Sequence, residues 1–453
     1  MKDQAIATRL CSGILLLSMI IELCGCSSGS GRSSSEDISN EIGQTDSVST
    51  DPVILSSHIS YGLKTVADYS VADGAGTDDG YYSVLSIPDE KYGADSEMEH
   101  AGLITYVDYS TGTNRVLCSD PDCKHNDESC TAYIKYVKEA YVFSTSDENN
   151  LIIISAGRRF SEEPSCVIYI ADADGSDRKE LAQLKNTECV DIGEVICCDN
   201  NSIFFIVFDV EKTLEDDDDS ASHHLKKVDL STGSCSDEMT FSSQPTLLGT
   251  YGDRILIAEY MRSVMTYYVT AYDPYTGASD VIFKQNKSFT DLYSYKFYSG
   301  MNGNDSSFEF KNYVTGTGGK IEGIKRSTVN SDCWFEYHDP DLNRWIFAYA
   351  EDKDGPVHAI HIDGDSGTVK ESSLLNGKIF TSPAGNIVGD FYVMTKANDR
   401  YLVKIGEKET SIGLYDNSGS PYTYTTMIPE YALIRCDDYW SDNHVYTSIN
   451  NEF

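Results

Sequence analysis

The chain has 453 residues, and its 72 Asp and Glu against 35 Lys and Arg give a formal net charge of −37. This charge excludes a nucleic-acid-binding protein, because binding to phosphate backbones depends on clustered Lys and Arg side chains. The content of 40% hydrophobic and 11% aromatic residues is enough to build a core, so the composition also excludes an intrinsically disordered chain. The length allows about three domains or one large repeat architecture.

The first 26 residues have the pattern of a lipoprotein signal peptide. Lys2 and Arg9 precede the apolar run 13–21, which is shorter than the roughly 20 residues that span a bilayer and suits a signal-peptide core. The segment 23–26, Leu-Cys-Gly-Cys, resembles a bacterial lipobox, whose last cysteine carries the lipid. We therefore expect lipidation at Cys26, with palmitate, and anchoring on the extracytoplasmic face of the cell membrane. The alternative is an ordinary secretory signal without a lipid.

Residues 27–52 are expected to form a flexible linker. They contain nine Ser and three Gly residues and almost no large apolar side chains. Residues 1–26 have no net charge and residues 27–52 carry −4, so −33 of the total belongs to residues 53–453. The linker thus separates the bilayer from an acidic folded domain, residues 53–453.

A strand, turn and strand module recurs along the folded domain. An alternating strand ends in Asp, a turn that contains Gly follows, and a second strand leaves. Gly permits the positive φ of such a turn, and the Asp side chain bonds to the backbone amides of the turn. The copies lie at 103–112, 167–175, 225–233, 269–277 and, in a more degenerate form, 357–364. The gap before the last copy leaves room for one more near 314–319.

Another strand pair precedes most of these hairpins, for example 141–143 with 151–154. Two strands and a hairpin make one four-stranded blade, and about 400 ordered residues correspond to roughly seven blades. The sequence therefore predicts an all-β protein, a β-propeller of seven four-stranded blades. The alternative is a pair of β-sandwiches, which would not need one hairpin type at one period. Ring closure is expected to pair a strand near 431–435 with an early strand near 81–86.

The hairpin module resembles the blade hairpins of TolB-like and quinoprotein-like propellers. The lipobox, the Ser-rich linker, the cysteine segment 117–130 and the ending 432–440 together resemble uncharacterised β-propeller surface lipoproteins of anaerobic Gram-positive bacteria, over nearly the whole chain. This resemblance implies a propeller in the cell envelope. It implies no activity, because none is established for that family.

Four potential metal ligands lie close together in the sequence. Cys118, Cys123, His125 and Cys130 follow the pattern Cys-x4-Cys-x-His-x4-Cys, and three thiolates with one imidazole are a complete tetrahedral set for zinc. We expect a structural zinc ion here, since a filled set leaves no open position for a substrate. The alternatives are a disulfide between two of the three cysteines, and reactive or incidental thiols.

The other mature cysteines are scattered along the predicted strands. We expect them to be reduced and buried in the core. They are Cys166, Cys189, Cys197, Cys198, Cys235, Cys333 and Cys436.

The sequence supports no assignment of catalytic residues, because no nucleophile is found with its base in a recognisable motif. We therefore expect a binding or interaction module with a protein or carbohydrate partner rather than an enzyme. One alternative is a propeller hydrolase or lyase acting on glycans, with carboxylates at the central channel. Another is an accessory or sensor subunit of an envelope complex. Polar residues converging at a channel mouth favour a small ligand, whereas a broad exposed aromatic patch favours a protein partner.

Overall fold

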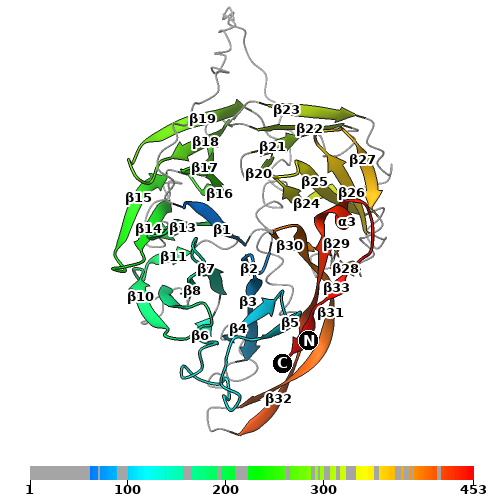
Figure 1. Ribbon diagram of the computed structural model, residues 1–453. Helices are drawn as coiled ribbons and strands as arrows, with labels where there is room; N and C mark the ends of the chain where they lie inside the picture. The colour runs from blue at the N-terminus through cyan, green and yellow to red at the C-terminus, as the bar shows by residue number, and fades with distance from the viewer. Residues whose placement is uncertain are drawn as a thin grey trace, which may run out of the picture.

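The computed structural model is a β-propeller, which confirms the fold class predicted from the repeated hairpins (Figure 1). Among the residues that the structure describes, seven sheets of four to six strands follow one another around a ring, together with one two-stranded sheet. Each of these seven sheets forms one blade of the ring. The sheet of β20 to β23 is made of short strands. The structure describes residues 62–69, 72–88, 100–137, 139–156, 166–190, 195–209, 223–241, 243–261, 266–286, 291–293, 296–299, 307–312, 317–322, 333–350, 357–372, 379–381, 387–389, 392–415 and 420–453.

Each blade is an antiparallel meander whose strands follow the chain order from the inside of the ring to the outside. The first blade contains β2 (Gly74–Gly76), β3 (Gly80–Pro88), β4 (His100–Asp108) and β5 (Thr113–Val116). The second contains β7 (Glu139–Ser144), β8 (Asn150–Ala156), β9 (Cys166–Asp172) and β10 (Lys179–Gln183). The third contains β12 (Val195–Cys198), β13 (Ser202–Asp209), β14 (His223–Asp229) and β15 (Cys235–Phe241).

The other half of the ring repeats this pattern. The fourth blade contains β16 (Pro245–Tyr251), β17 (Arg254–Met261), β18 (Thr266–Tyr272) and β19 (Ser279–Asn286), and the fifth β20 (Asp291–Tyr293), β21 (Lys296–Ser299), β22 (Ser307–Asn312) and β23 (Gly318–Glu322). The sixth contains β24 (Cys333–Asp339), β25 (Arg344–Ala350), β26 (Val357–Asp363) and β27 (Val369–Ser372). The two-stranded sheet, β28 (Ile379–Thr381) with β29 (Ile387–Gly389), precedes the seventh blade, which contains β30 (Tyr392–Ala397), β31 (Arg400–Tyr415), β32 (Pro421–Arg435) and β33 (Thr447–Ser448).

The predicted hairpins are the third and fourth strands of their blades. In four of the five copies the Asp and Gly are four positions apart, and the Gly has a positive φ of 69 to 72°. Asp229 is representative, because its Oδ1 accepts the Ser231 N–H at 3.0 Å and the Thr232 N–H at 2.8 Å. The copy at 357–364 is therefore regular rather than degenerate, since its turn glycine is Gly367. The additional copy expected near 314–319 is the hairpin β22–β23.

The strands β8 and β13, each the second strand of its blade, are almost entirely apolar because both of their faces are covered by neighbouring blades. In β8, Ile152 and Ile154 belong to the apolar cluster shared with the third blade, whereas Leu151 and Ile153 belong to the cluster of the first blade. All four side chains are fully buried. Face-to-face packing of blades, rather than one central core, thus accounts for the burial.

The ring closes differently from the sequence prediction. The strand that contains residues 431–435 pairs with β31 and β33, and β3 pairs with β2 and β4, so the expected pairing of these two segments is wrong. Instead the C-terminal strand β34 (Asn450–Glu452) pairs in parallel with β5, at the outer edge of the first blade. Tyr431 still contacts the first blade, because its ring lies 5.9 Å from that of Tyr81.

The first described strand, β1 (Lys64–Asp68), lies on the inner side of the ring. It pairs antiparallel with β12 and contacts β2, β7 and β16, so it touches four blades. Tyr69 follows it, and its hydroxyl donates to the Val142 carbonyl at 2.9 Å. The segment before the propeller therefore fills part of the space at the inner ends of the blades.

Several predictions concern residues outside the described part of the chain. They include the signal peptide 1–26 with Cys26 and the linker 27–52. None of the helices among the described residues has the length and apolar character needed for a membrane span.

Candidate metal centre

The cysteine and histidine cluster lies in a loop that leaves the outer strand of the first blade. The loop begins after β5 and ends at β6 (Tyr133–Val137), which pairs with β4. Its first residue, Leu117, is buried and donates its N–H to the Ile104 carbonyl at 2.9 Å. Thr131, at the other end, donates its hydroxyl to the Leu117 carbonyl at 3.1 Å. The two ends of the loop are thus held together on the blade.

Two Asp-initiated turns position two of the cysteines. Asp120 accepts the Cys123 N–H on its carbonyl at 3.2 Å and the Asp122 N–H on its side chain at 2.9 Å. Asp127 repeats this arrangement, since its carbonyl accepts the Cys130 N–H at 3.1 Å. The acidic residues of this loop therefore organise its backbone.

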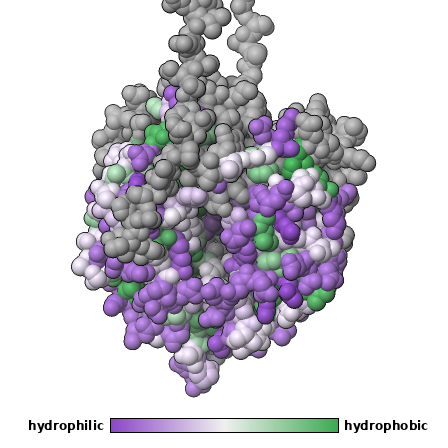
Figure 2. All heavy atoms as spheres, turned by 45° about the horizontal axis from the view of Figure 1, so that its top comes forward, coloured by the Kyte–Doolittle hydropathy of each residue, from purple (hydrophilic) through white to green (hydrophobic). Residues whose placement is uncertain are grey.

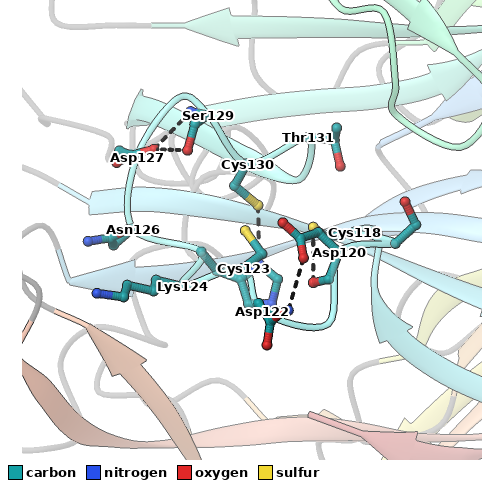
Figure 3. A pocket seen from close by; sticks show the side chains of 12 residues that line it. Cys118, Asp120, Asp122, Cys123, Lys124, Asn126, Asp127, Ser129, Cys130 and Thr131 are labelled. Carbon is teal, nitrogen blue, oxygen red and sulfur yellow. Dashed lines mark hydrogen bonds between the residues drawn. The ribbon is translucent and has the colours of Figure 1, made fainter.

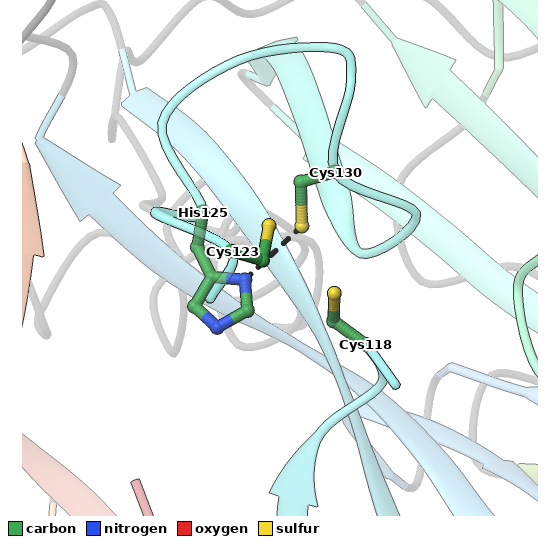
Figure 4. Close-up of side chains that lie close together, drawn as sticks. All are labelled: Cys118, Cys123, His125 and Cys130. Carbon is green, nitrogen blue, oxygen red and sulfur yellow. Dashed lines mark hydrogen bonds between the residues drawn. The ribbon is translucent and has the colours of Figure 1, made fainter. Parts of the chain in front are cut away.

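The four predicted ligands converge (Figure 4). One ligand atom from each of Cys118, Cys123, His125 and Cys130 lies within 4.8 Å of all the others. In a tetrahedral Zn–S site, bonds of about 2.3 Å place the sulfurs roughly 3.8 Å apart, so only a small contraction is required. His125 Nδ1 and Cys130 Sγ are already 3.1 Å apart. His125 has a φ of +51°, a left-handed conformation that turns the chain between the second and fourth ligand.

The surroundings of the ligands suit a structural site. Cys130 is 2% exposed and the other three are half-buried. The ligands lie beside a cavity of about 300 Å³ that is lined by residues of the same loop (Figure 3). The three thiols are free, as metal binding requires. Donor types, number and spacing therefore fit a tetrahedral zinc ion, although other soft metals accept the same set.

Burial affects the protonation of these groups. It raises the pKa of the Cys123 and Cys130 thiols and lowers the pKa of His125. Burial also acts to raise the pKa of the Cys118 thiol. Hydrogen bonds outweigh this effect, so the pKa of Cys118 is lowered, and the bond at the Asp120 backbone contributes most. A bound cation would favour the deprotonated thiols.

A residue that the sequence analysis did not select holds the base of the loop. Arg178, from the β9–β10 turn of the second blade, donates to the carbonyls of Tyr133, at 2.5 Å, and Thr131. Burial lowers the pKa of Arg178. No motif marks this arginine, because its role depends on two blades being adjacent.

The prediction that the remaining cysteines are buried is correct for Cys166, Cys197, Cys198 and Cys436. Cys189 is half-buried, and Cys235 is exposed on β15, which corrects that part of the prediction. Cys235 lies on β15, the last strand of the described sheet in its blade. The side chain of Cys333 lies outside the described part.

A second cavity, of about 260 Å³, lies between the turns of the second and third blades. Its polar lining consists mainly of amides and hydroxyls, from Asn150, Asn200, Asn201 and Ser231. Its carboxylate, Asp147, accepts hydrogen bonds from Thr145 at 2.6 Å and from Asn149 at 2.8 Å. We name this cavity the amide pocket.

Figure 2 shows one face of the molecule, coloured by hydropathy. Where residues are coloured in Figure 2, hydrophilic side chains dominate, and hydrophobic ones form small separate groups. The same view shows a hollow near the middle of the molecule with mostly hydrophilic residues beside it.

No protein-family model matches this sequence, and no curated protein matches it either. Among solved structures, the chain is similar to an acylaminoacyl peptidase of Pyrococcus horikoshii, with 12% identity, a TM-score of 0.47 and coverage of 80% of this chain and 57% of that one. It is also similar to the β-propeller domain of the Trilobed protease of Pyrococcus furiosus, with 11% identity, a TM-score of 0.45 and coverage of 86% and 98%. TolB of Acinetobacter baumannii shows 12% identity, a TM-score of 0.32 and coverage of 82% and 79%. These neighbours are β-propeller proteins.

Proposed function

We propose that this chain is a lipid-anchored, extracytoplasmic β-propeller that acts as a binding module, with a structural zinc ion in its first blade. The anchor rests on the sequence of the first 26 residues, and the linker 27–52 gives the propeller reach from the membrane. The zinc ion rests on the convergence of Cys118, Cys123, His125 and Cys130.

The main support for the binding function is the amide pocket. Amides and hydroxyls can donate and accept hydrogen bonds without charge, which suits a neutral, hydroxyl-rich ligand such as a carbohydrate. Among the described residues, the lining contains no His, Cys or Lys, and its carboxylate Asp147 is already bonded within its turn. A hydrolase or lyase would need a general acid or base facing the ligand. The pocket therefore favours binding over catalysis at this site.

A glycan array probed with the full-length chain tests the binding function. We expect retention on a subset of neutral oligosaccharides, and a loss of retention in Asn201→Ala, which removes an exposed amide from the pocket lining. Asn450→Ala is the control, because it removes an exposed amide on β34 at a distance from the pocket. Equal retention of the two variants would exclude the amide pocket as the binding site. Failure to bind any glycan would exclude a carbohydrate ligand and leave a protein partner.

Membrane fractionation tests the anchor. The wild-type chain is expected in the membrane fraction, Cys26→Ser in the soluble fraction, and the neighbouring control Cys24→Ser again in the membrane fraction. Membrane association of Cys26→Ser would contradict lipidation at this residue.

A further inference from the structure

The loop that carries the four candidate ligands, residues 117–131, is called the metal loop. It lies where the last blade meets the first. Its first ligand, Cys118, is two residues beyond β5, and β5 is the strand that receives the C-terminal β34. The register places Asn450 opposite Thr113 and Asn451 opposite Asn114. The loop and the closing strand therefore occupy the same edge of the first blade.

The long hairpin of the seventh blade also reaches this edge (Figure 1). The strands beside this hairpin pair with only part of it. On one side, β30 pairs with β31 no further than Lys404. On the other side, β33 pairs with Ala432 and Leu433 of β32. From Gly406 to Tyr415 the strand β31 pairs with β32 alone. An isolated two-stranded ribbon is marginally stable in water, so this extension needs a surface to pack on.

The surface that it packs on includes the metal ligands. Ile412, Leu414 and Ile428 of the hairpin are 4%, 2% and 1% exposed. They belong to the same apolar cluster as Cys130, and Cys118, Cys123 and the C-terminal Phe453 pack against that cluster. Lys124, between the second and third ligands, has its Nζ 5.1 Å from the centre of the Tyr415 ring. The hairpin and the C-terminus thus lie on a surface to which the loop contributes.

The metal loop has little regular structure to keep that surface in place. Between Val116 and Tyr133 it contains turns and bends but no strand or helix. Four ligands from one loop bound to one ion would restrict its conformations strongly.

We propose that a metal ion bound by Cys118, Cys123, His125 and Cys130 controls ring closure, by holding the surface on which the β31–β32 hairpin and the C-terminal strand pack. The inference rests on the proposed zinc site and adds its role. The ion stabilises a local clasp, defined as residues 117–131, 406–415, 420–428 and 447–453, rather than the rest of the propeller. Coupling between two sites is reciprocal, so the packed hairpin also strengthens metal binding.

Hydrogen–deuterium exchange of the full-length chain, with zinc and after removal of zinc by a chelator, tests the clasp. We expect peptides of the clasp to exchange about tenfold faster without zinc, which is within the range of typical coupling between sites. Peptides of the third and fourth blades, which do not contribute to the apolar cluster beneath the hairpin, are expected to exchange at unchanged rates. Cys123→Ser should behave like the chelated wild type. Cys235→Ser, with an exposed thiol on β15, is the matched control and should behave like the zinc-bound protein.

The outcomes separate the clasp from the zinc site. Stoichiometric zinc with no change of exchange in 406–415 and 420–428 would overturn the clasp and leave the zinc site standing. Absence of zinc from the wild type would overturn both. Faster exchange in every blade after chelation would also overturn the clasp, because the ion would then stabilise the whole propeller. The chelated wild type gives these answers even if Cys123→Ser does not fold.

The reciprocal experiment does not touch a ligand. Leu414→Ala removes a buried side chain from the hairpin, and we expect its zinc affinity, measured by competition with a chromophoric chelator, to fall by about tenfold. Val281→Ala, at a side chain that is 61% exposed on the fourth blade, is the control and should keep the wild-type affinity. Equal affinities of the two variants would overturn the coupling.

Discussion

The side-chain amide of Asn114 donates a hydrogen bond to Asn451 Oδ1 at 3.0 Å, although 337 positions separate the two residues. Asn114 is 2% exposed and lies on β5, and Asn451 lies on the C-terminal β34. Asn451 also donates to the Pro429 carbonyl of β32 at 3.1 Å. One pair of amides thus joins the first blade, the last blade and the end of the chain.

This pair should matter for closure. Asn114→Ala is expected to lower the free energy of unfolding by about 1 kcal/mol, because it removes a buried amide and leaves the half-buried Asn451 without that hydrogen bond. Urea denaturation followed by tyrosine and tryptophan fluorescence measures the change. Asn450→Ala, an exposed neighbour on the same strand, should stay near the wild-type value. A comparable loss in both variants would show that the strand, and not the amide pair, is what matters.

Two turn glycines with the same φ should respond differently to alanine. Gly233 and Gly277 have φ of +70° and +72°, but a Cβ at Gly233 would overlap the carbonyl oxygen of Leu181, whereas nothing lies within 4 Å of a Cβ at Gly277. Gly277→Ala is expected to cost about 1–2 kcal/mol from the left-handed backbone alone. Gly233→Ala should cost about 1–3 kcal/mol more, because the second and third blades must move apart. Thermal unfolding of both variants checks the order, and equal losses would contradict it.

A buried ion pair connects β11 (Glu188–Val190) to β14. Lys226 Nζ lies 2.8 Å from Glu188 Oε1, with side chains 4% and 3% exposed, and Lys226 also pairs with Asp237. Lys226→Met should lower the free energy of unfolding by about 3 kcal/mol, since it leaves a buried carboxylate without its main partner. Adding Glu188→Gln should restore part of the loss, and an unchanged loss would contradict this explanation.

The matched control for the buried pair is the exposed pair of Lys64 and Glu148. Its atoms are 3.4 Å apart and its side chains are 46% and 33% exposed. Lys64→Met should change the free energy of unfolding by less than about 1 kcal/mol, because exposed ion pairs contribute little. Urea denaturation in the same buffer compares the two lysines.

His361 should make the stability of the propeller depend on pH. Its ring is 4% exposed, stacks on Tyr439 at 5.3 Å and lies 4.8 Å from the Trp440 ring. Burial lowers the pKa of His361 to about 4, and the nearby Asp442 carboxylate only partly offsets this effect. The unfolded chain therefore binds a proton at a higher pH than the folded chain does, so stability is fully present above about pH 6.5 and declines as the pH falls toward 4.

His361→Phe removes the titrating group and keeps an aromatic ring. We expect its unfolding free energy to lose about 2–3 kcal/mol less than that of the wild type between pH 6.5 and 4. Urea titrations at several pH values in that interval measure the difference. Parallel pH profiles of the two proteins would show that other groups cause the acid sensitivity.

Local patterns were sufficient to predict the hairpins and to single out the four candidate metal ligands that lie close together in the structure. The spacing of Asp229 and Gly233 specifies a turn through one side chain and one backbone angle, both within five residues. Cys118 to Cys130 converge because short turns bring them together. The long hairpin β31–β32 was harder to recognise in the sequence. Tyr422 and Tyr424 alternate with small polar residues, which indicates a strand with one face packed against the protein.

Closure could not be predicted in the same way. Residues 431–435 have the composition of a strand, but many edges could accept them, and the pairing with β31 and β33 depends on the whole ring. The same holds for Arg178 and β1. Arg178 of the second blade bonds to the loop of the first blade, and β1, which precedes the first blade, pairs with β12 of the third.

The sequence by itself determined the repeated hairpins, the all-β class and the cluster of candidate metal ligands, because these depend on interactions between residues close together in the chain. Only the tertiary structure decided that β34 joins β5, that β1 lies inside the ring, and that the metal loop lies beneath the hairpin of the last blade. The physical reason is that contacts between distant segments depend on the stacking of all the blades, and no local pattern of residues encodes which edges then meet.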